Sequence, residues 1–164
     1  MKKYLKTGLI ALATILVLSQ FIRPEKNLSA NVNNDITKAF VVPDSIQNIL
    51  KTSCYDCHSN KTVYPWYAEV QPVAWWLDDH IHEGKKEVNF NEFASYKPRR
   101  QFKKFTEIIE QEEEDEMPLK SYTIIHRDAV MSPEKKAQLI AWAQAMKDTM
   151  SAHYPADSLV IKKR

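Results

Sequence analysis

Two cysteines and a histidine stand within five residues of one another in the segment CYDCH, residues 54–58. Cys54 and Cys57 are the only cysteines of the 164-residue chain, and His58 follows them directly. Two thiols at this spacing can form a disulfide, exchange electrons as a dithiol, or bind zinc with further ligands. They can also each add to a vinyl group of a haem, and the next residue then offers its imidazole to the iron.

The surrounding sequence favours covalent haem attachment. A redox dithiol needs one thiol with a lowered pKa, usually at a helix start, whereas here a predicted helix runs into the motif. Structural zinc needs four ligands, and the motif supplies three. A disulfide between Cys54 and Cys57 would close a loop too small to add much stability. C-x-x-C-H is the attachment signature of c-type haem, and its single copy predicts one haem c with His58 as proximal iron ligand.

A haem iron has a second axial position, for which the chain offers several candidates. Met117 is preferred, because it precedes Pro118 where a predicted helix ends, and a loop there can present the thioether to iron. His80, His82 and His126 are alternatives, and an open position is another. Ligation by Met117 would close the iron to substrates, which predicts an electron carrier rather than an enzyme.

Two other functions stay open. If Met117 does not bind the iron, the open distal side would suit a haem-based peroxidase or a gas sensor, with His126 and Arg127 as an acid–base pair. If no haem is attached, the chain would be an exported C-x-x-C dithiol oxidoreductase. In the carrier, the acidic run over residues 112–116 is either a solvated face or a rim that docks a basic redox partner.

The N-terminal segment is typical of export. Lys2, Lys3 and Lys6 precede an uncharged apolar run over residues 8–22. At ~1.5 Å per residue this run is short of the ~30 Å hydrocarbon core, although snorkelling lysines can extend it. Because no small-residue cleavage pattern follows, we expect a single-pass anchor in the inner membrane, with a cleaved signal peptide as the alternative. The remainder is then periplasmic, where covalent haem attachment is possible.

The composition predicts an all-α fold. Hydrophobic residues make up 44% of the chain, charged residues 27%, and only two glycines occur. The net charge of +2, without a basic face that carries aromatics, argues against a nucleic-acid partner. Apolar periodicity predicts helices over residues 43–54, 73–83, 97–113 and 131–150.

Local signals refine these helices and the domain limits. Asp44 and Ser132 are the predicted N-caps, and Gly84 is the predicted stop of the second helix. The tryptophans and tyrosines over residues 64–76 are expected to wall the haem crevice. The predicted organisation is a signal or anchor over 1–22, a polar linker over 23–41, a cytochrome c-like domain over 42–150 and a tail over 151–164.

At these motifs the sequence resembles c-type cytochromes, and more closely a bacterial haem-binding domain family of membrane-tethered monohaem proteins. The resemblance covers approximately residues 14–146, including SQFIRPEKN, CYDCHSNKTVYPWYAEVQPVAWWLDDHIHEGKKEVNF and MPLKSYTIIHRDAVMSPEKKAQLIAWA. It implies covalent haem on Cys54 and Cys57 with His58 proximal, and similarity to cytochromes c implies Met117 as distal ligand. The expected function is one-electron transfer with redox partner proteins of the respiratory or periplasmic system.

Overall fold

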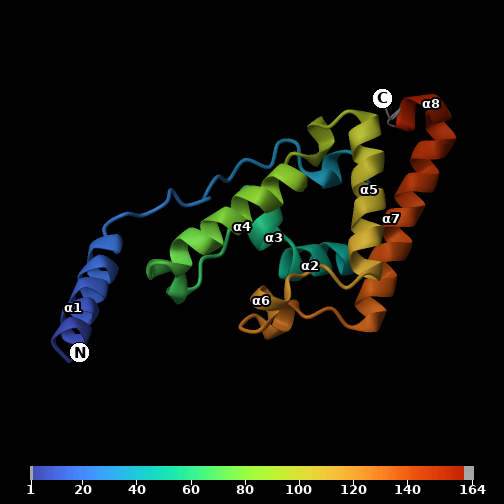
Figure 1. The fold of residues 1–164 in the computed structure, drawn as a ribbon. Coiled ribbons are helices and arrows are strands. Elements are labelled where there is room, and N and C mark those ends of the chain that lie inside the picture. The colour runs from blue at the N-terminus through green and yellow to red at the C-terminus, as the bar shows by residue number, and fades with distance from the viewer. Residues whose placement is uncertain (1, 161–164) are drawn as a thin grey trace.

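The protein is described by a computed structural model that covers residues 2–160 (Figure 1). Within this range the regular elements are helices, and the one β-type contact is an isolated antiparallel bridge between Leu28 and Lys61. The predicted all-α class is therefore confirmed.

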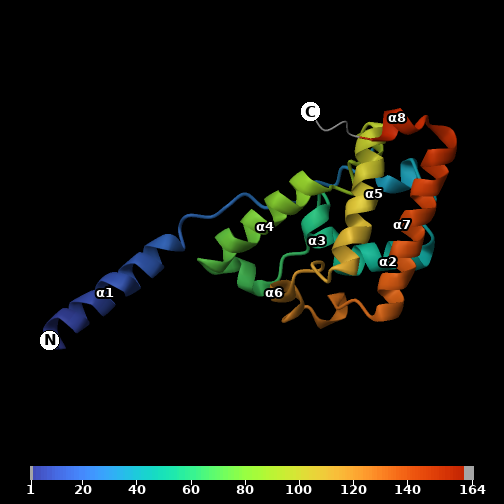
Figure 2. The ribbon, with the colours of Figure 1, turned by 45° about the vertical axis from the view of Figure 1, so that its right-hand side comes forward.

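Two long helices form one side of the helical body. α5 (Pro98–Glu113) and α7 (Pro133–His153) lie side by side along their lengths (Figures 1 and 2). α2 (Asp44–Ser53) packs against α7, and the short α8 (Ala156–Leu159) packs back on α5. The predicted third and fourth helices are confirmed within one or a few residues.

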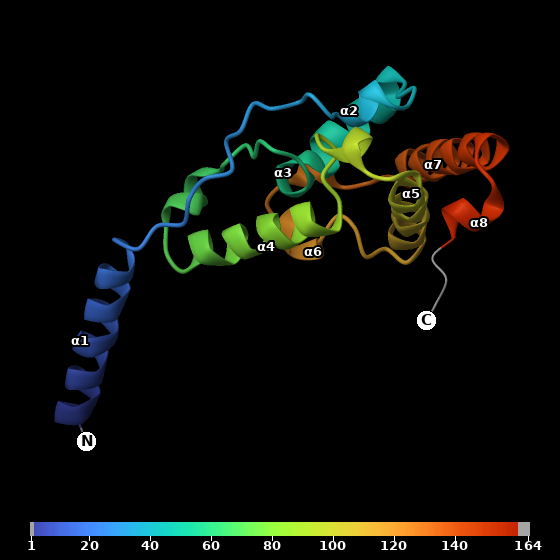
Figure 3. The ribbon, with the colours of Figure 1, turned by 90° about the horizontal axis from the view of Figure 1, so that it is seen from above.

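The other side of the body carries the attachment motif. α3 (Tyr55–His58) is a single helical turn directly after α2, and it packs against α4 (Val73–Glu87), as Figure 3 shows from above. α6 (Lys120–Thr123) lies in the segment between α5 and α7. Short 3₁₀ helices complete the body at Ile36–Lys38, Trp66–Glu69, Phe93–Ser95 and Arg127–Ala129.

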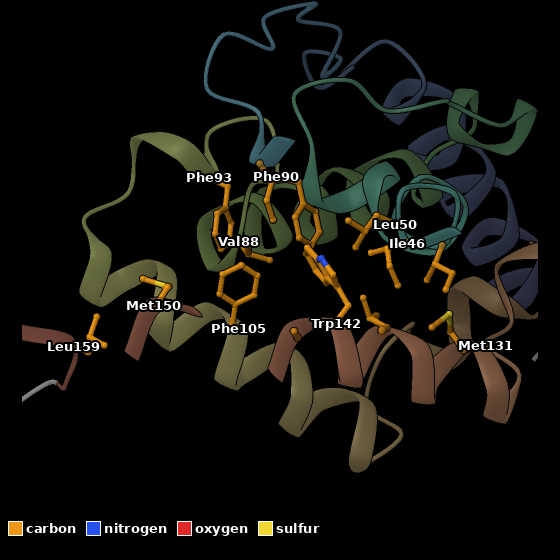
Figure 4. Packing of buried hydrophobic residues seen from close by; sticks show 14 residues of the cluster. Ile46, Leu50, Val88, Phe90, Phe93, Phe105, Met131, Trp142, Met150 and Leu159 are labelled. Carbon is orange, nitrogen blue, oxygen red and sulfur yellow. The ribbon is translucent and has the colours of Figure 1, made fainter. Parts of the chain in front are cut away.

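The apolar faces of α2, α5 and α7 meet in one core (Figure 4), whereas Leu77 and Ile81 of α4 form a second, smaller cluster with Ala68. Phe105 of α5 packs edge-on against Trp142 of α7, with ring centroids 5.6 Å apart. The indole of Trp142 donates to the carbonyl oxygen of Val41 at 3.0 Å, so its polar atom is satisfied. Met131, which precedes the N-cap of α7, and Met150 are buried in this core, and Met146 packs against it.

The predicted helix ends are correct in one case and displaced in two. Ser132 caps α7, accepting from the Lys135 amide at 3.3 Å, and Pro133 is the first helical residue. The predicted N-cap of α2 is wrong by one position, because Pro43 caps the helix and Asp44 is its first residue. α4 does not stop at Gly84 but continues to Glu87, because Gly84 does not adopt the positive φ of a glycine that ends a helix.

The N-terminal helix forms where an anchor is expected. α1 (Lys2–Ser19) extends away from the helical body, and none of its residues is buried (Figure 2). It includes Lys2, Lys3 and Lys6, so its uncharged part is shorter than the helix. In the range 2–160, no helix is both long enough and apolar enough to cross a membrane. The membrane-spanning anchor predicted over residues 1–22 is thus not supported by the structure.

Residues 23–41 are mostly exposed but are bonded to the domain at several points, whereas the sequence predicts a loose linker. Ile36 is fully buried in the core. The Asn27 side-chain amide donates to the Ser59 carbonyl oxygen at 2.9 Å, and the Asn91 amide donates to an Asp35 carboxylate oxygen at 2.7 Å. The polar side chains of this segment therefore form specific bonds with loops of the domain.

The tail predicted over residues 151–164 is also packed where the structure describes it. Leu159 of α8 is only 4% exposed, because it closes one end of the core. The Arg99 guanidinium donates to the carbonyl oxygens of Asp157 and Ser158 at 3.4 and 3.3 Å. Residues 161–164 lie outside the described residues.

Candidate functional site

The attachment motif lines a cavity of about 570 Å³. Within the motif, the Cys54 carbonyl oxygen accepts hydrogen bonds from the backbone amides of Cys57 and His58, at 3.2 and 2.9 Å. This single turn places residues three and four apart on the same side of the helix. Both thiols and the His58 ring consequently border the same space, as C-x-x-C-H spacing predicts.

The His58 ring is oriented by backbone acceptors. Its Nδ1 atom donates to the carbonyl oxygens of Gly84 at 2.8 Å and Val88 at 3.0 Å. These bonds fix the tautomer and leave Nε2 with the lone pair. Burial lowers the pKa of His58, with a further lowering from the Lys104 charge, although the two backbone bonds oppose this. The ring is therefore kept as the neutral imidazole that a metal needs.

Gly84 allows α4 to approach the motif closely. A Cβ atom at this position would lie 2.8 Å from the Cys57 carbonyl oxygen and 3.1 Å from the Cys57 Cβ. The 2.8 Å contact is shorter than real Cβ atoms show, and its partner is a backbone atom, so a larger residue would push α3 and α4 apart. Gly84 thus serves the packing of the two helices and the acceptor for His58, rather than ending α4.

Met117 borders the same cavity as His58. α5 ends just before it in a Schellman-type turn, with the Glu116 amide donating to the Gln111 carbonyl oxygen at 3.0 Å. Asp115 takes the left-handed conformation that this turn requires, with φ of 57°, and its carboxylate pairs with Lys136 of α7. The helix end and this ion pair position the Met117 segment at the cavity.

The alternative histidine ligands differ in their positions. His80 also lines the cavity, and its Nδ1 bonds the Trp76 carbonyl oxygen at 2.8 Å. His82 is exposed beside Asp78 and does not line it. His126 does not line it either, and its Nε2 shares a 2.6 Å hydrogen bond with the Tyr67 hydroxyl. Only Met117 and His80 of the predicted sixth-ligand candidates therefore border the cavity within residues 2–160.

The chemistry of the two thiols argues against a redox dithiol. Burial raises the pKa of Cys54 to about 12, with further contributions from the charges of Glu112 and Cys57. Burial and the Asp56 charge raise the pKa of Cys57 to about 11. Exchange needs a thiolate, and a dithiol enzyme lowers the pKa of its attacking cysteine. These environments do the opposite.

A family model described as a haem-binding domain matches residues 14–145, well over half of the chain. The chain belongs to this family. No curated protein and no solved structure matches the chain. The predicted family resemblance is thus confirmed.

The cavity of this haem-binding domain fits the cofactor by size and lining. Cofactor pockets typically have volumes of ~300–1,000 Å³, with walls that are mainly apolar. Leu50, Val88, Phe90, Ile108 and Leu139 supply such walls. Because the porphyrin brings its own four nitrogens, the chain has to supply only attachment points and axial ligands.

Two buried polar atoms in the lining also indicate that the cavity receives a bound group. Within the described residues, Ser53 Oγ and Glu112 Oε2 are buried without a hydrogen-bond partner, and both residues line the cavity. Glu112 is 5% exposed, and burial raises its pKa to about 7, although the Lys136 charge opposes this. Unpaired buried polar atoms are costly, so they are typical of a cavity that receives a bound group or water.

The sequence did not identify Glu112 as part of the site. It lies within the acidic run, where we expect solvated carboxylates or a docking rim. Its burial removes it from any exposed rim, and Asp115 is engaged by Lys136. The signal that could have found Glu112 is its spacing of seven residues from Phe105, which places it near the apolar face of α5.

The aromatic cluster predicted to wall the crevice lies elsewhere. Trp66 is 81% exposed, and Trp75 and Trp76 are exposed as well. None of them lines the cavity, and the Trp75 indole donates instead to the Ile22 carbonyl oxygen at 3.1 Å. The start of α4 and the loop before it pack on residues 20–27, so this prediction is wrong.

Proposed function

We propose that the haem-binding domain carries one covalently attached haem c and transfers single electrons as a cytochrome. The observation that carries this proposal is the common cavity bordered by Cys54, Cys57, His58 and Met117. In this proposal Cys54 and Cys57 would hold the haem through their sulfurs, and His58 Nε2 and the Met117 sulfur would ligate its iron. Bound haem supplies an iron that changes reversibly by one electron.

The remaining residues of the chain set the environment of that iron. The carbonyl oxygens of Gly84 and Val88 hold His58 in one orientation and make its ring a more basic ligand. Apolar side chains such as Phe90 and Leu139 exclude water, which tunes the reduction potential. If Met117 ligates the iron on its second side, no position would be open for a substrate, and the domain would be a carrier rather than an enzyme.

The compartment and partners belong to the proposal too. Lysines followed by an apolar run favour export, and an oxidising periplasm permits covalent haem attachment. We therefore place the domain in the periplasm, exchanging electrons with other redox proteins there. The mass of the mature protein distinguishes a cleaved signal peptide from a retained α1 that keeps the domain at the inner membrane.

Covalent attachment is tested directly on the purified protein. We expect the red colour to remain with the polypeptide after acid–acetone extraction, and to be lost from it in the Cys54→Ala, Cys57→Ala double variant. A colourless wild-type protein, produced in cells that mature c-type cytochromes, would refute the function.

The sixth ligand is tested by the ferric absorption spectrum. Thioether ligation gives a weak band at the red edge, which we expect in the wild type and not in Met117→Ala. Met146→Ala is the matched control, because Met146 packs against the core and does not line the cavity. If Met117→Ala keeps the wild-type spectrum, His80 becomes the next ligand to replace, since it also borders the cavity.

The peroxidase or sensor alternative receives less support from the geometry. It relies on His126 and Arg127 acting at an open distal side. Neither residue lines the cavity, and His126 is bonded to Tyr67. A ferric iron that binds peroxide or cyanide as fast as an open haem would nevertheless favour this function over a closed carrier.

A further inference from the structure

We propose that Asp56 and Tyr122 are positioning residues that hold the Met117 segment at the iron. Asp56 is the second residue between the two cysteines of the attachment motif, and Tyr122 lies in α6. The inference rests on the proposed function, since it assigns a role toward the sixth ligand. It concerns no atom of the reaction itself, because neither residue ligates the iron.

The bond between the two residues is short and its acceptor is charged. The Tyr122 hydroxyl donates to an Asp56 carboxylate oxygen at 2.7 Å. Burial, together with the hydrogen bond to Asp56, raises the pKa of Tyr122 well above its ordinary value. The hydroxyl therefore stays protonated and remains a donor. Hydrogen bonds to an ionised acceptor are about twice as strong as those between neutral groups.

Asp56 is itself fixed on the motif side. Its second carboxylate oxygen accepts from the Val63 amide at 3.1 Å, and its backbone carbonyl accepts from the Thr62 hydroxyl at 2.6 Å. Because both carboxylate oxygens are engaged, the side chain has one orientation available. The bond from Tyr122 to Asp56 therefore fixes the position of α6 relative to the turn that carries both cysteines and His58.

Tyr122 is close in the chain to the ligand that it would position. Its amide donates to the Leu119 carbonyl oxygen at 3.0 Å, and only Pro118 and Leu119 separate Met117 from the start of α6. Its ring stacks on His126 at 4.2 Å between centroids and 11° between planes, and His126 bonds Tyr67. Met117, Pro118, Leu119 and Tyr122 all line the cavity.

These contacts carry most of the polar attachment of this segment. Among hydrogen bonds within residues 2–160, two side-chain bonds join residues 117–129 to the part of the chain around the motif: Tyr122 to Asp56 and His126 to Tyr67. The other bonds of residues 117–129 are local or reach the end of α5. Losing the Asp56 bond should therefore free the segment more than it unfolds the domain.

The experiment measures how readily an external ligand displaces the methionine in the holoprotein. Imidazole binds ferric iron only when Met117 has left, so its apparent affinity reports the fraction of detached molecules. For Tyr122→Phe we expect imidazole to bind roughly tenfold to hundredfold more tightly, which corresponds to losing one hydrogen bond to a charged group. Asp56→Ala removes the acceptor of the same bond and should act in the same direction.

The controls separate positioning from folding. Tyr154→Phe makes the same change at the end of α7, away from α6, and should leave imidazole affinity unchanged. Covalent haem content should stay at the wild-type level in each variant. The double variant should bind imidazole about as well as the stronger single variant, because both changes remove the same bond.

The outcomes distinguish this inference from the proposed function. Imidazole affinity in Tyr122→Phe within twofold of the wild type, with the red-edge band intact, overturns the positioning role and leaves the cytochrome in place. Fully additive effects of the two single variants also overturn it. A wild-type holoprotein without the thioether band overturns the positioning role together with Met117 ligation, while covalent haem would still stand.

Discussion

Substituting Gly84 with alanine sets two opposing effects against each other. In a helix interior this change normally stabilises by ~1 kcal/mol, because glycine is the poorer helix former. Here the new methyl group would meet the Cys57 carbonyl oxygen at 2.8 Å and the Cys57 Cβ at 3.1 Å. The carbonyl oxygen belongs to the backbone of the motif, so it cannot rotate out of the way.

The steric effect should win. Overpacking typically costs ~1–3 kcal/mol, and contacts with fixed backbone lie toward the upper part of that range. After subtracting the gain in helix propensity, we expect Gly84→Ala to lower the free energy of unfolding by roughly 1–2 kcal/mol. For a domain of this size the melting temperature should then fall by roughly 3–10 °C.

Thermal unfolding followed by circular dichroism, at matched haem content, measures this shift. Gly8→Ala is the matched control, since a Cβ atom there has no neighbour within 4 Å. It makes the same chemical change in α1 and should not lower the melting temperature. If Gly84→Ala melts at or above the wild-type temperature, close packing of α4 on the motif does not require a glycine.

Two further predictions concern the interior. Burial raises the pKa of Glu112 to about 7, whereas an unfolded glutamate titrates near ~4.3, so the folded state holds a proton that the unfolded chain releases between these values. The free energy of unfolding should therefore fall as pH rises through this window and level off above it. Glu112→Gln should reduce the difference between the free energies of urea unfolding at pH 5 and pH 8. An unchanged difference would contradict the assignment. Phe105→Ala should cost ~3–5 kcal/mol in urea unfolding, because this ring is fully buried between α5 and α7, whereas Val160→Ala at an exposed position should cost little.

The helices could be predicted well because their signals are local. Ser132 followed by Pro133 starts α7, and the apolar spacing of Phe102, Phe105 and Ile109 defines the inner face of α5. Gly84 shows where such reasoning fails. In a sequence, a glycine near the end of an apolar pattern predicts a stop, but its neighbour Cys57 is 27 positions away in the chain and visible only in the fold.

The segments outside the predicted domain were misjudged for a related reason. The polar composition of residues 23–41 predicts a linker. In the structure, however, Asn27 and Asp35 form hydrogen bonds with specific partners, and Ile36 is buried in the core. In the same way, the exposure of Trp66 reverses the expectation that aromatic residues near the motif wall the cavity. Composition does not report which partner a side chain meets.

The sequence by itself determined the all-α class and the three residues of the C-x-x-C-H motif that point to covalent haem, because these depend on spacing within one turn or one helix. It also determined the family, because the resemblance extends over most of the chain. Tertiary structure decided the rest of the site. It selected Met117 and His80 from the sixth-ligand candidates, placed Glu112 in the cavity and joined Tyr122 to Asp56 across 66 positions. Such contacts follow from how helices pack, and packing depends on all of their faces together rather than on any local pattern.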